Sequence, residues 1–175
     1  MLGLLKGVQM EIKEAIFRRK SFGKIRQDAL PRPLLEELLD AAAQAPNHFL
    51  VRPWRFVVIS GDARVRLGQV MAATMRKEKP DATEEALKAE GLRPLRAPVL
   101  IAVGVDLPQL ERVVLVENIC AAAAATQNLL LLAQSRGLAA IWRTGPAAED
   151  PEVKKFLGFS PDQPLIGFVY LGYPA

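Results

Sequence analysis

The chain has 175 residues but only one cysteine and one histidine, which excludes several kinds of site. A lone cysteine cannot form a disulfide within the chain, and this fits a reducing cytosol. One cysteine and one histidine cannot build a typical zinc site, so no metal is expected. Cys120 stands among apolar residues, with no nearby base to activate it, and is therefore predicted to be a small core residue.

The sequence motifs of common nucleotide and hydrolase sites are also missing. No Gly-x-Gly-x-x-Gly follows an expected strand and there is no phosphate-binding P-loop, so a Rossmann dinucleotide site is not indicated. Ser21, His48 and Asp62 do not form a recognisable catalytic motif. Because acid and base side chains are so poorly grouped, an enzyme with this sequence would leave the difficult step to a cofactor.

Charge and hydropathy restrict the partners. The net charge is +4, aromatic residues make up 6%, and acidic residues interrupt the basic ones, so nucleic-acid binding is not expected. The most apolar stretch, 119–133, is too short and too polar to cross a bilayer, because Thr126, Gln127 and Asn128 interrupt it. Residues 1–7 lack the features of a signal peptide. We therefore expect no membrane association and a soluble, cytoplasmic protein.

Hydrophobic residues make up 50% of the chain, and their spacing predicts one α+β domain over residues 1–175. The expected architecture is an α/β sandwich in which helices flank a small mixed sheet. Helices are expected at 8–19, 33–45, 63–77, 83–90, 117–136 and 150–157, and strands at 54–60, 99–105, 139–142 and 165–171.

Two of these segments have unusual composition. The longest helix, 117–136, is apolar nearly all round and is expected to be buried on most sides, and its alanines at 121–125 would let another helix approach closely. Residues 78–98 are the most polar stretch, with proline near both edges and a weak core signal. This stretch is predicted to be a mobile flap.

Three short segments carry candidate binding residues. Arg19, Lys20 and Ser21 follow the first helix and suit a phosphate and a ribityl chain, although a solvated basic helix end has the same composition. His48, after Ala45 and Pro46, is either a ligand contact or an ordinary capping or surface histidine.

The third segment, Trp142, Arg143 and Thr144, ends an expected strand, where α/β sheets tend to place ligands. An arginine between an indole and a glycine can reach a flavin or a phosphate. The alternative is that Trp142 belongs to the core and Arg143 is a surface charge.

Taken in order, segments along nearly the whole chain resemble the short, compact branch of the nitroreductase family of FMN-dependent flavoproteins. The segments that carry the resemblance are 19–21, 34–46 with His48, 53–58, 117–118 with the helix up to 137–138, 141–145 and 167–174.

The resemblance implies the nitroreductase fold and a homodimer with FMN at the subunit interface, built around the long central helix. It implies these cofactor contacts: Arg19, Lys20, Ser21, Gln44, His48, Trp142, Arg143 and Thr144. No protein side chain is expected to be catalytic, because the flavin carries the chemistry. NADH or NADPH would reduce the flavin, and a nitroaromatic, quinone or enone would then take the electrons in a ping-pong reaction. The cation that stabilises the reduced flavin would be Lys20, Lys24 or Arg143.

The chain departs from the family pattern at Lys20, where a second arginine is usual, and at Gly23, where a basic residue is often found. The family also commonly continues beyond the position of Ala175 into a tail with basic phosphate contacts. Two outcomes are open: the loss of these contacts weakens FMN binding, or Arg18 and Lys24 compensate for it. Two other functions remain open at this point: a flavin carrier with little turnover, and an interaction module that has lost FMN.

Overall fold

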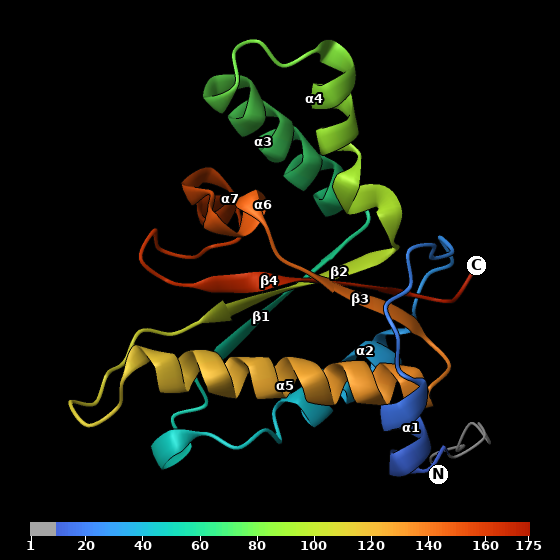
Figure 1. Ribbon diagram of the computed structural model, residues 1–175, viewed down its shortest axis with the longest axis vertical. Coiled ribbons are helices and arrows are strands. Elements are labelled where there is room, and N and C mark those ends of the chain that lie inside the picture. Colours follow the sequence, from blue (N-terminus) through green and yellow to red (C-terminus); the bar gives the residue numbers. More distant parts are fainter. Residues whose placement is uncertain (1–9) are drawn as a thin grey trace.

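The computed structural model describes residues 10–175 and has a four-stranded sheet between two layers of helices (Figure 1). The strand order is β1 (Trp54–Ser60), β2 (Val99–Val105), β4 (Leu165–Gly172) and β3 (Ala139–Arg143), and every neighbouring pair is antiparallel. The predicted α+β class and all four expected strands are confirmed, but the expected mixed sheet is wrong, because every strand pair among the described residues is antiparallel. β3 forms one edge of the sheet.

Helices cover the two faces unequally. On one face lie α1 (Ile12–Arg18), α2 (Arg32–Ala42) and the long α5 (Leu115–Ser135); on the other lie α3 (Asp62–Glu78), α6 (Pro146–Glu149) and α7 (Pro151–Phe156) (Figure 1). Helix α4 (Glu84–Gly91) packs on α3. Two short 3₁₀ helices complete the fold, η1 (His48–Leu50) and η2 (Arg93–Arg96). Neither 3₁₀ helix nor α6 was expected from the sequence.

The apolar side chains of the strands divide between the two faces. In β2 every residue is buried: Val99, Ile101 and Val103 pack in the cluster with α2 and α5, whereas Leu100 and Ala102 pack in the cluster with α3 and α7. A strand buried on both faces reads as a continuous apolar run, because side chains alternate between the faces. This explains why the strands could be located from sequence.

Helix α5 is buried on one face only, and this corrects the expectation that it is buried on most sides. Its buried residues are Asn118, Ala121, Ala122, Ala125, Thr126, Leu129, Leu130 and Ala133. Val116 is 60% exposed and Cys120 is also exposed, so the prediction that Cys120 belongs to the core is wrong. The sequence shows that α5 is apolar all round, but a single chain covers only part of it.

Helix α1 is shorter than predicted and also leaves apolar residues uncovered. It begins at Ile12, and Val8 and Gln9 of the expected helix lie outside the described residues. Only Ala15 is buried; Ile12 and Ile16 are exposed, and Phe17 is 81% exposed. The apolar side chains of Ile12, Ile16 and Phe17 therefore face away from the rest of this chain.

Helix α5 is long and apolar enough to cross a membrane by length and composition. This is weak evidence for a membrane span, because the core helix of a soluble protein passes the same test. In this fold α5 packs against α1, α2 and the sheet.

Candidate functional site

The end of β3 separates the side chains of the predicted segment 142–144. The Trp142 indole packs with the α5 cluster and its Nε1 donates a hydrogen bond of 3.1 Å to the carbonyl of Ile166. The Arg143 side chain lines a pocket on the opposite face of the sheet, where α3 lies. Thr144 follows at the rim and is exposed. A ligand that contacts all three residues must therefore lie across the end of this edge strand.

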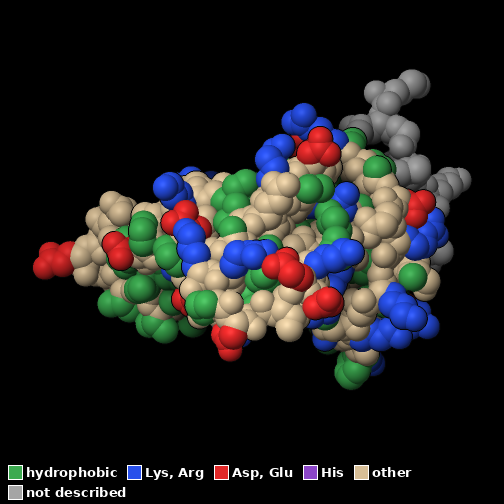
Figure 2. Space-filling model, turned by 90° about the horizontal axis from the view of Figure 1, so that it is seen from above, with side chains coloured by type: hydrophobic (Ala, Val, Ile, Leu, Met, Phe, Trp, Pro, Cys, Tyr) green, Lys and Arg blue, Asp and Glu red, His purple; other side chains and the backbone are tan. Residues whose placement is uncertain are grey.

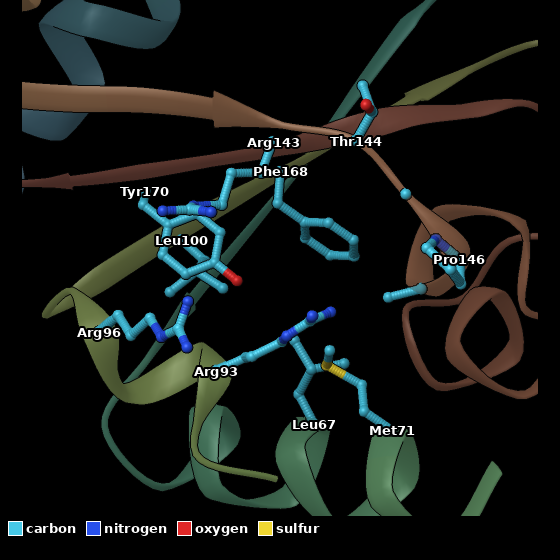
Figure 3. Close-up of a pocket in the computed structure, with 12 residues that line it drawn as sticks. Leu67, Met71, Arg93, Arg96, Leu100, Arg143, Thr144, Pro146, Phe168 and Tyr170 are labelled. Atoms are coloured by element: carbon cyan, nitrogen blue, oxygen red, sulfur yellow. The ribbon is translucent and has the colours of Figure 1, made fainter. Parts of the chain in front are cut away.

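The pocket beside Arg143 has a volume of about 180 Å³ and lies between the sheet, α3 and η2 (Figure 3). Its walls combine apolar and aromatic side chains with three arginines. The residues that line it are Leu67, Met71, Arg93, Arg96, Leu100, Arg143, Thr144, Gly145, Pro146, Ala147, Phe168 and Tyr170. Among residues 10–175, no Asp or Glu lines this pocket.

Three arginines in this pocket surround Tyr170. The guanidinium carbon of Arg143 lies 5.7 Å from the centre of the Tyr170 ring. Burial raises the pKa of the Tyr170 hydroxyl, and the positive charges of Arg143, Arg93 and Arg96 oppose part of that rise. All three cations therefore act on the Tyr170 hydroxyl, and the negative charge of Glu90 acts on it in the opposite direction.

Arg143 itself has an unmet hydrogen-bonding requirement. Its Nε is buried and has no hydrogen-bond partner within the described part of the chain. Leaving a buried donor unpaired is costly, so such a group in a folded protein points to a missing partner. A ligand with an acceptor atom at the end of β3 would provide one.

The cationic segment 19–21 lies along the same edge strand, nearer its beginning. The backbone N–H of Phe22 donates to the carbonyl of Ala140 at 3.1 Å, which fixes the loop beside β3. Arg19 is half-buried, whereas Lys20 and Ser21 are exposed. Three residues of strand separate Ala140 from Arg143, about 10 Å. The structure therefore places the predicted segments 19–21 and 142–144 along one edge of the sheet.

Gln44 and His48 lie elsewhere. Gln44 is exposed after α2, and its side chain donates to the carbonyl of Asp40 at 3.2 Å. His48 Nδ1 lies 3.4 Å from a carboxylate oxygen of Glu117 in the first turn of α5. Glu117 also accepts a hydrogen bond from the Val114 N–H, so one carboxylate caps α5 and holds His48.

The loop after His48 is conformationally unusual. Phe49, Leu50 and Arg52 all have positive φ, at 49°, 55° and 48°. Bulky residues rarely adopt this region, and such strain is found mainly where surrounding structure enforces it, often at functional sites. Arg112 packs against this loop: its guanidinium carbon lies 4.2 Å from the centre of the Phe49 ring.

Within one chain, His48 and the loop 19–21 lie at opposite ends of α5. Figure 1 shows η1 beside the N-terminal end of α5, and α1 beside its C-terminal end. From Glu117 to Ser135 the helix extends about 27 Å at 1.5 Å per residue. Gln44 follows the end of α2, where the Ala41 carbonyl accepts a hydrogen bond from Asn128 in the middle of α5. His48 is therefore separated from the loop 19–21 of its own chain.

Sequence reasoning missed Arg93 and Arg96. They lie within residues 78–98, which were expected to form a flap, and nothing in the local pattern links them to Arg143. The spacing Arg93-x-x-Arg96 around Pro94 is the only local signal, because it places two cations on one short turn.

Comparison with known proteins identifies the family of this chain. The family model described as "Nitroreductase family" matches residues 16–173, so the chain belongs to the nitroreductase family. YfhC of Bacillus subtilis, a provisionally named NAD(P)H nitroreductase, is 30% identical over 164 residues, covering 93% of this chain and 84% of YfhC.

Solved structures of similar proteins share the fold. A nitroreductase-like protein from Bacillus cereus has a TM-score of 0.79 and 26% identity, covering 95% of this chain and 87% of that one. A nitroreductase with bound FMN from Bacteroides fragilis has a TM-score of 0.73 and 25% identity, covering 95% and 89%. The nitroreductase fold expected from the sequence is confirmed.

Proposed function

We propose that this protein is an FMN-dependent NAD(P)H oxidoreductase. Membership of the nitroreductase family and the FMN-bound relative from Bacteroides fragilis support the class of reaction. The single observation in this chain that carries the proposal is the buried, unpaired Nε of Arg143 at the end of β3. A flavin offers carbonyl oxygens and ring nitrogens that such a donor can bond.

The residues along the edge of β3 fit FMN. Arg19, Lys20 and Ser21 supply exposed donors for the phosphate and ribityl chain, and they lie beside the same strand as Arg143 and Thr144. When bound, FMN accepts a hydride from NAD(P)H and supplies the electrons for the acceptor. Of Lys20, Lys24 and Arg143, we propose Arg143 as the cation that stabilises negative charge on the reduced ring, because it is the least exposed and already fixed against Tyr170.

The acceptors we propose are nitroaromatics, quinones and enones. For a nitroaromatic, one hydride and one proton reduce the nitro group to a nitroso group, and one water molecule leaves, while NAD(P)H is oxidised to NAD(P)⁺. Separate binding of donor and acceptor to one site gives ping-pong kinetics. No side chain has to act as a nucleophile, which agrees with the poverty of catalytic groups in the sequence.

We also propose that the protein is a homodimer formed through α5. The exposed face of this helix carries Val116 and Cys120, with half-buried alanines beside them, and small residues permit close approach of a second helix. A two-fold symmetric interface must be self-complementary. An apolar helix face that is uncovered in one chain meets this requirement by packing on its own copy.

The two ends of α5 support an antiparallel arrangement. Near its C-terminal end α1 exposes Ile12, Ile16 and Phe17, and near its N-terminal end η1 exposes Phe49 and Leu50, the latter by 76% (Figure 1). If two copies of α5 cross in opposite directions, the patch on α1 of one subunit meets the patch on η1 of the other. Each exposed patch then has an apolar partner.

The same arrangement would bring the predicted contacts together. It would carry Gln44 and His48 of the partner subunit toward the cationic segment 19–21 and the β3 edge of the first. Each dimer would then hold two sites, and each site would draw on both chains. The position of His48 and of the segment 19–21 at opposite ends of α5, about 27 Å of helix at 1.5 Å per residue, supports the need for a partner.

The test is an absorption spectrum of the purified protein before and after addition of FMN, followed by NADH and NADPH. Bound flavin that is bleached by either nucleotide and reoxidised by a nitroaromatic supports the proposal. Flavin binding without turnover would leave a carrier, and failure to bind FMN would leave an interaction module. Fractionation of the source cells would test the proposed cytoplasmic location.

A further inference from the structure

Arg93 and Arg96 have no part in the site as proposed above, yet they line the pocket beside Arg143. We propose that these two residues, with Arg143, form an anion-binding subsite that selects aromatic acceptors bearing a carboxylate. The inference rests on the proposed function, because it assigns a substrate class to the same pocket.

The charge of the pocket is the first argument. Three guanidinium groups line it, and no acidic residue of the described chain does. Arg93 is paired with Glu90 at 3.1 Å, but Glu90 lies outside the lining. Arg96 and Arg143 form no ion pair within residues 10–175. The pocket therefore holds more positive charge than its protein neighbours neutralise, and an anionic ligand would balance it.

The second argument is the lining of the pocket. Leu67, Met71 and Phe168 lie around the Arg93 side chain, and Arg143 and Arg96 lie on either side of Tyr170 (Figure 3). An aromatic ring with one carboxylate matches a pocket in which apolar and aromatic side chains lie next to guanidinium groups.

The size of the pocket supports a small ligand. Its volume of about 180 Å³ is below the roughly 300–1,000 Å³ typical of sites for larger, drug-sized ligands. A single substituted ring is the appropriate scale. Because Arg143 and Thr144 belong both to this pocket and to the proposed flavin contacts, such a ring would lie next to the flavin.

The backbone that carries Arg93 and Arg96 is held in place by the fold, and their exposed side chains extend from it. Pro94 is buried, and the carbonyl of Leu95 accepts a hydrogen bond of 2.9 Å from the Gln27 side chain. Arg64 of α3 donates to the carbonyl of Ala97 at 2.6 Å. These bonds fix the C-terminal end of η2, so a carboxylate would have to order the arginine side chains but not their backbone.

The experiment uses the FMN-loaded protein and two matched acceptors, 4-nitrobenzoate and 4-nitrobenzamide. We expect a higher kcat/KM for the anion. Arg96→Gln should lower the anion-to-amide ratio about tenfold, the usual scale for losing a hydrogen bond to a charged group. Arg96→Lys should keep part of the preference, and Arg66→Gln, an exposed arginine of α3 outside the pocket, should keep all of it.

A binding measurement separates this inference from the proposed function. Calorimetry with benzoate and benzamide, without any electron donor, should show weaker benzoate binding in Arg96→Gln and unchanged benzamide binding. If Arg96→Gln and Arg66→Gln have the same anion preference, the inference is wrong. It is also wrong if Arg96→Gln loses FMN, since the arginines would then contact the cofactor. If no acceptor is reduced but the benzoate result holds, the proposed function fails and the anion site remains.

Discussion

Gly68 of α3 and Gly91 of α4 meet so closely that a Cβ on Gly68 would overlap the carbonyl oxygen of Gly91. The reverse contact is ordinary, since a Cβ on Gly91 would lie 3.4 Å from the Gly68 carbonyl oxygen. We predict that Gly68→Ala lowers the free energy of unfolding by about 1–3 kcal/mol, as overpacking does. Gly91→Ala is the matched control and should be nearly neutral. Denaturant unfolding of both variants would test this asymmetry, and equal stabilities would contradict it.

The cationic segment 19–21 gives a second prediction, which concerns the affinity for FMN. Arg19→Ala should weaken FMN binding about tenfold, because a hydrogen bond to a charged phosphate is lost. Arg32→Ala is the control, since Arg32 is an exposed arginine of α2 that is paired with Glu36 at 2.7 Å. Fluorescence titration with FMN measures both affinities, and circular dichroism checks the fold. An Arg19→Ala variant that purifies with full flavin content would refute the assignment.

Substitution of Arg143 should impair FMN binding and leave the stability of the FMN-free protein nearly unchanged. Arg143→Met removes a guanidinium whose buried Nε lacks a partner and replaces it with an apolar chain of similar length. Without FMN we expect the free energy of unfolding to stay within about 1 kcal/mol of the wild-type value, because an unsatisfied donor stabilises little. With FMN, the rise in melting temperature seen for the wild type should be largely absent. A variant that keeps that rise would show that Arg143 does not hold the flavin.

The proposed dimer can be disrupted at one residue. Phe17→Asp places a charge at the patch on α1 that would face η1 of the partner, so it should shift the protein toward monomer and reduce flavin retention. Val65→Asp is the control, because Val65 is also a partly exposed apolar residue on a helix but lies on α3. Light scattering after gel filtration gives the masses. A dimeric Phe17→Asp protein would reject the arrangement.

Tyr170 predicts a pH dependence. Burial raises the pKa of its hydroxyl above the ordinary value of 10.0, so the unfolded chain loses this proton before the folded chain does. The unfolded state then binds fewer protons, and stability falls as pH rises above the unfolded pKa. Tyr170→Phe should therefore lose stability less steeply in alkaline solution. Unfolding curves from pH 8 to about 11 test this, and parallel losses would exclude Tyr170 as a cause.

The sequence locates the helices and strands better than it identifies the surfaces that cover them. The strands were found because continuous apolar runs such as 99–105 fit only a strand buried on both faces, and Gly137 correctly ended α5 with a φ of 70°. The exposure of Cys120 could not be foreseen, because hydrophobicity does not say whether the covering surface belongs to the same chain. The helix expected at 63–77 begins one residue earlier, at Asp62, and ends one residue later, at Glu78.

The candidate site could likewise be predicted only in part from the sequence. Segments 19–21 and 142–144 could be identified because a short local pattern carries each one, and the structure places both along β3. Their side-chain directions required the sheet, since alternation sends Trp142 and Arg143 to opposite faces. Arg93 and Arg96 could not be joined to Arg143 without the fold, because about 50 residues of sequence separate them.

The distribution of charge over the surface agrees with a local, rather than a general, attraction for anions. On the face above α3 and α4, Lys and Arg side chains are interspersed with Asp and Glu (Figure 2). Ionic strength should therefore have little effect on the long-range encounter with anionic acceptors, because the opposite surface charges largely cancel at a distance.

The 3₁₀ helix η2 directly joins α4 to β2. One stretch of backbone therefore forms a wall of the pocket and carries two of its three arginines. Any movement of residues 78–98 that widened the entrance would also carry Arg93 and Arg96 away from Arg143. A wider entrance would then discriminate poorly between acids and neutral molecules. Closure of the entrance would restore the discrimination. Selectivity in such an enzyme would be a property of how long the entrance stays shut.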